Sequence, residues 1–151
     1  MYFDKDLCLF NLNVDTQKQL FEEMSKTLLK NKCVKETYLR GITQREAQYP
    51  TGIWFEDTGF AIPHTDSKHV IQSQICFASL KKPILFYDMT DMNKTVSVEL
   101  VFMLAMAQPH EQVETLQNLM KLFQDKKSVK ELKECSTIES FNEILNRMNI
   151  K

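Results

Sequence analysis

The sequence contains few glycines and no closely spaced cysteines. Its three glycines, Gly41, Gly52 and Gly59, cannot form a G-x-G-x-x-G or Walker loop, so nucleotide-dependent transfer is disfavoured. A G-x-S-x-G nucleophile motif is absent as well. The four cysteines include no C-x-x-C pair, so neither a redox motif nor a zinc knuckle is indicated. We therefore expect no nucleotide, metal or other cofactor.

Long apolar runs and an excess of one charge are absent too. The longest apolar run, residues 101–107, is far shorter than the roughly 20 residues that a membrane helix needs. Asp4, Lys5 and Asp6 lie where a signal peptide would need an apolar stretch. Lys and Arg number 19 and Asp and Glu number 20, a net charge of −1 that does not favour nucleic acid as a partner. These features predict a cytoplasmic protein with no membrane insertion.

The sequence does contain a block of strand-like segments between helical ones. Val, Ile and aromatic residues mark the strands, and apolar residues at helical spacing mark the helices. Asp15 is expected to cap the first helix, and Pro50 to end the second. The predicted strands are 7–12, 53–55, 59–62, 73–80, 84–87 and 96–106; helices are predicted after Asp15, at about 35–48, from Pro109 onward, and at about 127–134 and 137–148. We expect one α/β domain, residues 1–151, with a mixed β-sheet flanked by helices on both faces; the pattern does not predict the strand order.

The first candidate for chemistry is His64, in the segment "GFAIPHTD". Pro63 keeps Ile62 extended and has no N–H, so sheet pairing should end at this point. The imidazole would then be held at the end of a strand by a stiff backbone, as group transfer or ligand binding requires. The alternative is a histidine that only caps the strand end with a hydrogen bond.

His110, in "QPHEQVETLQNLM", is the second candidate. Pro109 favours the first helical position, so His110 should lie in the first turn, where unpaired backbone N–H groups attract anions. The apolar stripe of this helix is expected to include Val113, Leu116, Met120 and Phe123, so His110 should point along the packed face. The alternative is a histidine at a helix start without a functional role.

Arg45, in "TQREAQYPTG", is the third candidate and lies in the last turn of the second helix. An arginine there often hydrogen-bonds the terminal carbonyls of its helix. The alternative is a planar, permanently charged donor directed at a phosphate. Thr51 offers a hydroxyl in the turn that follows.

A metal site is a further possibility, because His64, Asp66 and His69 in "HTDSKH" are all acceptable ligands. However, these residues lie across a predicted turn, and neither HExxH nor HxHxD occurs. We expect Asp66 to be a turn residue and His69 a surface residue. Of the aromatic residues, Trp54 and Phe60 are expected to pack in the core. The alternative is that they contribute to an apolar contact surface for partner proteins around His64.

Three segments, "REAQYPTG", "GFAIPHTD" and "QPHEQVETLQNLMKLF", together resemble the enzyme IIA component of the sugar phosphotransferase system. Similarity in order and spacing to its fructose/mannitol superfamily (type 2) runs from about residue 7 to 145. The "YPTG" and "PHTD" variants resemble the galactitol branch. Many members have glycine directly after the histidine, where this chain has Thr65.

The resemblance implies a role for each candidate. His64 matches the histidine that accepts a phosphoryl group from the phosphocarrier protein HPr and passes it to a cysteine of enzyme IIB. His110 matches the second active-site histidine, and Arg45 an arginine close to it. The fold implied is an α/β sandwich around a mixed sheet. The membrane enzyme IIC would be an indirect partner.

Three functions therefore remain open at this point. The first is a phosphocarrier in carbohydrate transport, whose sugar the sequence does not identify. The second is a regulatory phosphoprotein, similar to the nitrogen-type relatives, that binds a target according to the phosphorylation state of His64. The third is a metal-dependent hydrolase that uses His64, Asp66 and His69.

Overall fold

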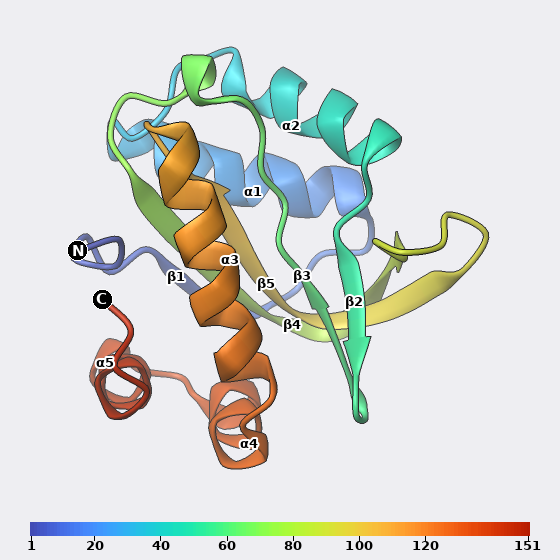
Figure 1. Cartoon of the computed structure of the whole chain (residues 1–151), viewed down its shortest axis with the longest axis vertical. Coiled ribbons are helices and arrows are strands. Elements are labelled where there is room, and N and C mark those ends of the chain that lie inside the picture. The colour runs from blue at the N-terminus through green and yellow to red at the C-terminus, as the bar shows by residue number, and fades with distance from the viewer.

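The computed structural model describes residues 1–151, and a five-stranded β-sheet forms its centre. From one edge to the other the strands run in the order β1, β4, β5, β3, β2 (Figure 1). The strands are β1 (Cys8–Leu12), β2 (Gly52–Phe55), β3 (Thr58–Ala61), β4 (Gln74–Tyr87) and β5 (Thr95–Ala105). The helices are α1 (Gln17–Lys30), α2 (Tyr38–Gln48), α3 (Pro109–Phe123), α4 (Lys126–Glu134) and α5 (Ile138–Arg147), and a short 3-10 helix, η1, covers Ser67–His69. None of the helices combines the length and apolar character that a membrane crossing requires.

The sheet is mixed. β1 runs parallel to β4 and β3 parallel to β5, whereas the pairs β4–β5 and β2–β3 are antiparallel. At β3 the chain approaches its neighbour very closely, because a Cβ added to Gly59 would lie 1.9 Å from the Ser97 carbonyl oxygen. Gly59 is therefore required for β3 to pair with β5, and β3 is the strand that leads to His64.

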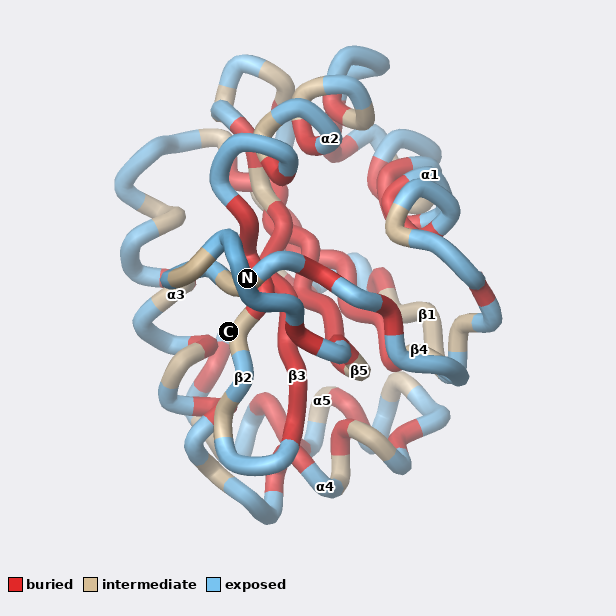
Figure 2. The backbone as a smooth tube through the Cα atoms, turned by 90° about the vertical axis from the view of Figure 1, so that its right-hand side faces the viewer, coloured by how far each residue is buried: buried red, intermediate tan, exposed pale blue.

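Helices cover both faces of the sheet, as predicted. Because side chains alternate along a strand, β5 sends Val101 and Met103 to one face and Leu100 and Phe102 to the other. The first face packs against α1 and α2, and the second against α3, α4 and α5. Figure 2 shows the buried strands enclosed between these two layers. The predicted α/β fold with a mixed sheet is confirmed.

Two element predictions are wrong in detail. The segments 73–80 and 84–87 belong to one strand, β4, whose pairing with β5 shifts between Ser79 and Ile84. Pro83 lies inside this irregularity, where a strand can tolerate a residue without an N–H. The cap of α1 is Thr16 and not Asp15: the Thr16 hydroxyl accepts a hydrogen bond from the Gln19 N–H at 3.1 Å.

The apolar stripe of α3 also differs from the prediction. Its buried residues are Thr115, Leu119, Leu122 and Phe123, while Val113 is 59% exposed. The prediction that Phe60 packs in the core is confirmed, because Phe60 is fully buried and stacked on Phe123 with ring centroids 4.0 Å apart. The same prediction is wrong for Trp54, which lies on the edge strand β2 and is 52% exposed.

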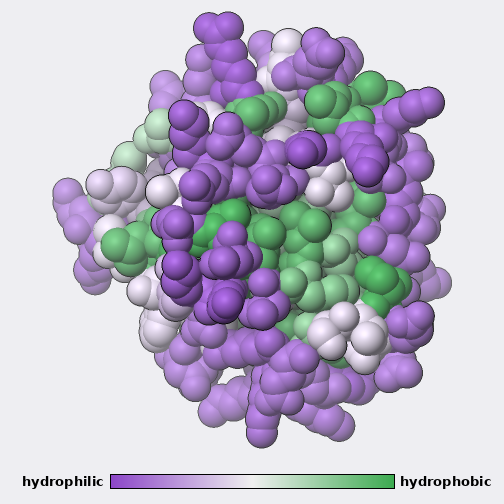
Figure 3. Space-filling model, turned by 180° about the vertical axis from the view of Figure 1, so that it is seen from behind, coloured by the Kyte–Doolittle hydropathy of each residue, from purple (hydrophilic) through white to green (hydrophobic).

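Several other large apolar side chains reach the surface. Seen from behind, apolar residues form a band across the middle of the molecule, bordered by polar ones (Figure 3). The exposed large apolar residues of the chain are Met1, Leu29, Tyr49, Trp54, Ile71, Leu85, Tyr87, Met89, Met92 and Val113. Continuous apolar surface of this kind is typical of proteins that contact other proteins.

Candidate functional site

His64 lies directly beyond the end of β3. The preceding residues Ile62 and Pro63 are buried, and the Pro63 carbonyl accepts a hydrogen bond from the Leu104 N–H at 2.9 Å, which fixes the chain against β5. The imidazole itself is half-buried, so one part of it faces outward. The backbone therefore presents this side chain from a rigid base.

One hydrogen bond determines which ring nitrogen of His64 is free. Nδ1 lies 2.8 Å from the Ile62 carbonyl oxygen. A carbonyl oxygen can only accept, so Nδ1 carries the proton in the neutral ring. Nε2 is then left with a lone pair and no proton, which is the state that a nucleophile needs.

The surroundings of His64 also keep the ring neutral. Burial lowers the pKa of His64 from its ordinary value of 6.5, and the positive charge of Arg45 lowers it further. The hydrogen bond to Ile62 and the charge of Asp66 act in the opposite direction but do not cancel the effect of burial. At neutral pH the imidazole is therefore unprotonated at Nε2.

Arg45 is half-buried in the last turn of α2, and its guanidinium is uncompensated. Its Cζ lies 4.4 Å from the centroid of the Tyr49 ring, in cation–π geometry. Nε is buried without an acceptor, and the guanidinium forms no ion pair. The carbonyl of Arg45 accepts from the Tyr49 N–H at 2.7 Å, so backbone and not side chain closes the helix. The helix-capping alternative is therefore wrong, and the charge of Arg45 is near enough to His64 to lower the pKa of its imidazole.

Glu46 is a residue of this region that the sequence prediction missed. It is buried, and both of its oxygens contact Thr51: Oε2 accepts from the Thr51 N–H at 2.7 Å, and Oε1 lies 2.8 Å from the Thr51 hydroxyl. Tyr38, Ile42 and Glu46 are the buried residues of α2 and follow one another at four-residue intervals. That spacing was a usable signal, because it places a carboxyl group on the apolar face of a helix.

Burial raises the pKa of Glu46 to about 7, against hydrogen bonds from Thr51 that lower it. The folded protein then binds this proton more tightly than the unfolded chain, so stability falls as pH rises from about 4.5 through 7. We expect the Glu46→Gln variant to keep both bonds to Thr51 and to lack this loss. Its free energy of unfolding should gain about 3 kcal/mol on the wild type between pH 4 and pH 8. Urea unfolding of both proteins at each pH measures the difference. If the free energies of unfolding of the wild type and the variant changed with pH in parallel, the expectation would be wrong.

His110 lies in the first turn of α3 and is exposed. The prediction that it points along the packed face is wrong, because the buried stripe of α3 has a different phase. No hydrogen bond joins His110 to His64. The start of α3 nevertheless lies beside the chain that follows His64 (Figure 1), since the Gln112 side-chain amide donates to the Thr65 carbonyl at 3.1 Å. The positive end of α3 is thereby held near His64.

A second set of contacts that the prediction missed fixes the start of α3. The Glu111 carboxylate accepts from the Gln108 N–H at 3.0 Å, completing a capping box with the helix start. It also accepts from the Ser73 hydroxyl at 2.7 Å and from the Tyr2 hydroxyl at 2.9 Å. These contacts tie the helix that carries His110 to the residue just before β4 and to the N-terminal segment.

The residues of the metal alternative do not come together. His69 turns towards α2: Nδ1 lies 2.8 Å from the Thr37 hydroxyl, and its ring packs on Gly41, where an added Cβ would lie 2.9 Å away. His69 is thus half-buried and holds η1 against α2, not the surface residue expected. Asp66 is exposed and precedes η1, as expected of a turn residue. No group of three or more His, Cys, Asp or Glu side chains is arranged to hold a metal ion.

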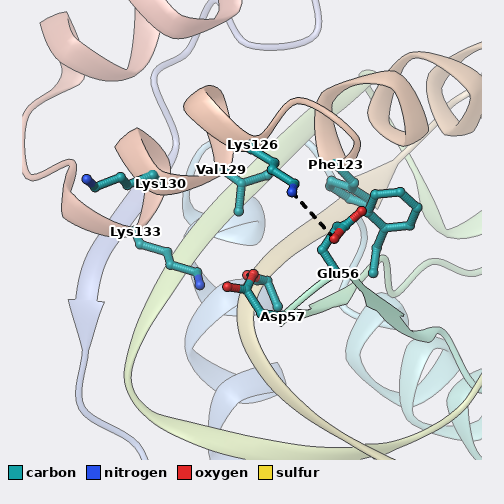
Figure 4. Close-up of a pocket in the computed structure, with 9 residues that line it drawn as sticks. Glu56, Asp57, Phe123, Lys126, Val129, Lys130 and Lys133 are labelled. Atoms are coloured by element: carbon teal, nitrogen blue, oxygen red, sulfur yellow. Dashed lines mark hydrogen bonds and ion pairs between the residues drawn. The ribbon is translucent and has the colours of Figure 1, made fainter.

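Two cavities lie on the same side of the sheet as α3 and α4 or beside the segment that leads to His64. The larger, about 430 Å³, lies between the β2–β3 turn and α4, with Lys126 pairing with Glu56 at 3.7 Å while Lys130 points away (Figure 4). None of the predicted site residues lines it. A cavity of about 250 Å³ includes Ile62, two residues before His64, and is lined mainly by apolar side chains of β2, α3 and the β4–β5 connection.

Solved structures show which fold class this is. A Streptococcus mutans protein assigned as a PTS IIA component (PtxA) superimposes with a TM-score of 0.82 over 98% of this chain and 92% of that one, at 18% identity. The solution structure of the complex of enzyme IIA mannitol and phosphorylated enzyme IIB mannitol from Escherichia coli gives a TM-score of 0.73 over 93% and 94%, at 16% identity. At these identities the likeness establishes the fold.

The sequence comparisons identify the family. The galactitol-specific EIIA component of the PTS system of Escherichia coli K12 is 29% identical over 103 residues, which cover 68% of each chain. Residues 1–148 match the family model of the phosphoenolpyruvate-dependent sugar phosphotransferase system, EIIA 2. The chain belongs to this family.

Proposed function

We propose that this protein is a cytoplasmic phosphocarrier that accepts a phosphoryl group from phospho-HPr on Nε2 of His64 and donates it to a cysteine of a cognate enzyme IIB during carbohydrate uptake. The observation that carries the proposal is the hydrogen bond from Nδ1 of His64 to the Ile62 carbonyl. It leaves Nε2 unprotonated on a half-buried ring at a strand end. Residues 1–151 act as one EIIA type-2 domain in this proposal.

Neither the transfer of the phosphoryl group to His64 nor its transfer from His64 to enzyme IIB needs a cofactor. In the first, the Nε2 lone pair forms a bond to phosphorus while the N–P bond of phospho-HPr breaks, and the electron pair returns to the HPr imidazole. Because Nε2 carries no proton, none has to leave. In the second, a thiolate of enzyme IIB attacks phosphorus, the Nε2–P bond breaks and the lone pair returns to His64.

Arg45 and the start of α3 stabilise the transferring group in this mechanism. Phosphoryl transfer passes through a loose transition state with charge on three equatorial oxygens, so catalysis is mainly alignment and electrostatic stabilisation. The guanidinium of Arg45 has free donors, and the unpaired N–H groups at the start of α3 add positive potential. His110 stands at that helix start, open to an approaching partner protein.

The relatives support the proposed partners and substrate class. The mannitol relative forms a complex with its phosphorylated enzyme IIB, and the curated relative is galactitol-specific. We propose a galactitol-type system for this chain, with HPr and enzyme IIB as direct partners and the membrane enzyme IIC as an indirect one.

The test is reconstitution with phosphoenolpyruvate, enzyme I and HPr. We expect one acid-labile, base-stable phosphate, on Nε2 by NMR, and transfer from purified phospho-HPr should proceed equally well in a chelator. The label should then move to a cysteine of the cognate enzyme IIB. A protein that is labelled but passes the group to no enzyme IIB would fit the regulatory alternative, and a protein that is not labelled would refute the proposal.

For His110→Ala we expect a protein that still accepts the phosphoryl group, because the nucleophile is intact, but transfers it more slowly. The capping box that holds the helix start does not involve the imidazole. Rapid-quench measurement of both half-reactions tests this, with circular dichroism as the check on folding. Complete loss of labelling in a folded variant would contradict the accessory role proposed for His110.

A further inference from the structure

Glu46 is a buried carboxyl group that the proposed mechanism does not use. It follows Arg45 directly in α2 and is 5% exposed. Both of its oxygens are occupied by Thr51, itself 2% exposed. The carboxyl therefore does not pair with the guanidinium beside it in the sequence. Burying such a group is unfavourable unless its hydrogen bonds are satisfied, and here Thr51 satisfies both oxygens.

The Glu46–Thr51 contact closes the connection between α2 and the sheet. It spans residues 46 to 51, which include Tyr49, whose ring lies against the Arg45 guanidinium. Beyond Thr51 the chain enters β2, where Gly52 pairs with Ala61 of β3. Ala61 stands three residues before His64. The contact thus joins the helix end that carries Arg45 to the strand pair that carries His64.

Arg45 has no other anchor that fixes its position. The guanidinium forms no ion pair, and Nε has no acceptor. Its remaining support is the ring of Tyr49, a 58% exposed side chain that depends on the same connection for its place. If residues 46–51 shifted, Arg45 would shift with them.

We propose that Glu46 is a positioning residue for the phosphoryl transfer: its two hydrogen bonds to Thr51 hold the end of α2, and with it the guanidinium of Arg45, in place beside His64. The inference rests on the proposed function, since it assigns Glu46 a role through Arg45. By satisfying its own oxygens on Thr51, Glu46 also leaves the charge of Arg45 available to the transferring group.

The test is a double-mutant cycle on the rate of transfer from phospho-HPr at saturating donor. Glu46→Ala should slow the maximal rate about 10-fold, because small misplacements of a positioned group are costly. Glu46→Gln should transfer close to the wild-type rate, since its amide can accept from the Thr51 N–H and donate to the hydroxyl. In the Arg45→Ala background, Glu46→Ala should cause no further loss.

Thr51→Val gives a milder variant should Glu46→Ala fail to fold, because it removes the hydroxyl and keeps the backbone N–H. It should slow transfer in the wild-type background and not in Arg45→Ala, whereas Thr51→Ser should behave as the wild type. The inference would be overturned if Glu46→Ala or Thr51→Val slowed transfer equally with Arg45 present and absent, or if a folded variant transferred at the wild-type rate. It would also be overturned if Glu46→Gln transferred as slowly as Glu46→Ala. Absence of His64 labelling in the wild type would instead overturn the proposed function.

Discussion

Replacement of His64 by alanine is expected to abolish phosphorylation by phospho-HPr. The variant loses Nε2, the unprotonated ring nitrogen that acts as the nucleophile in the proposed mechanism. The fold should persist, because the imidazole is half-buried and makes one hydrogen bond, to the Ile62 carbonyl. Labelling from phosphoenolpyruvate through enzyme I and HPr, followed on a gel, measures the outcome.

A matched control comes from the same segment. His69→Ala removes an imidazole five residues away, which contacts Thr37 and Gly41 and plays no part in the mechanism. It should be labelled as the wild type is, although η1 will be less firmly held. Normal labelling of His64→Ala would show that another residue accepts the group and would remove the basis of the proposed function.

Replacement of Arg45 by alanine should slow transfer about 10²-fold, the usual effect of losing one donor that stabilises transition-state charge. The loss should appear in the maximal rate, because the guanidinium acts on charge that develops during transfer. Folding should be little affected: the side chain has no ion pair, and its stacking on Tyr49 is worth about 1 kcal/mol. Rapid-quench kinetics and urea unfolding measure the two effects separately.

Arg45→Lys separates charge from geometry. Lysine keeps the positive charge but lacks the planar set of donors and the stacking on Tyr49, so we expect a rate between those of the alanine variant and the wild type. An Arg45→Ala protein that is unfolded, or one that is folded and transfers at the wild-type rate, would contradict a role in stabilising the phosphoryl group.

Local sequence signals predicted where several strands and helices end. The proline before His64 predicted the strand end, and Pro50 predicted the end of α2, where Tyr49 leaves the helical conformation. The phase of α3 was predicted less well. Apolar residues occupy two adjacent stripes on this helix, and the choice between Val113 and Leu119 as core depends on which stripe meets Phe60 and Phe102.

Other features depend on contacts between residues far apart in the chain, and local patterns do not contain them. The strand order, with β1 beside β4 and β3 beside β5, is set by how the two helical layers cover the sheet. The hydrogen bond of His69 to Thr37 joins residues 32 positions apart, so it too depends on the folded chain. The sequence therefore predicts His64, Arg45 and His110 as candidate site residues, but it does not predict the contacts that their side chains make in the folded protein.

If His64 carries the phosphoryl group as proposed, the hydrogen-bond partner of its Nδ1 affects how stable the phosphohistidine is. A carboxylate in that place would make the imidazole more basic and therefore a poorer leaving group, whereas a backbone carbonyl carries no net charge. Burial acts in the same direction, because it lowers the pKa of His64. An imidazole of low basicity is a better leaving group when the N–P bond breaks. In the proposed mechanism, the Ile62 carbonyl thus orients the ring without stabilising the phosphohistidine so strongly that transfer to a thiolate of enzyme IIB would become unfavourable.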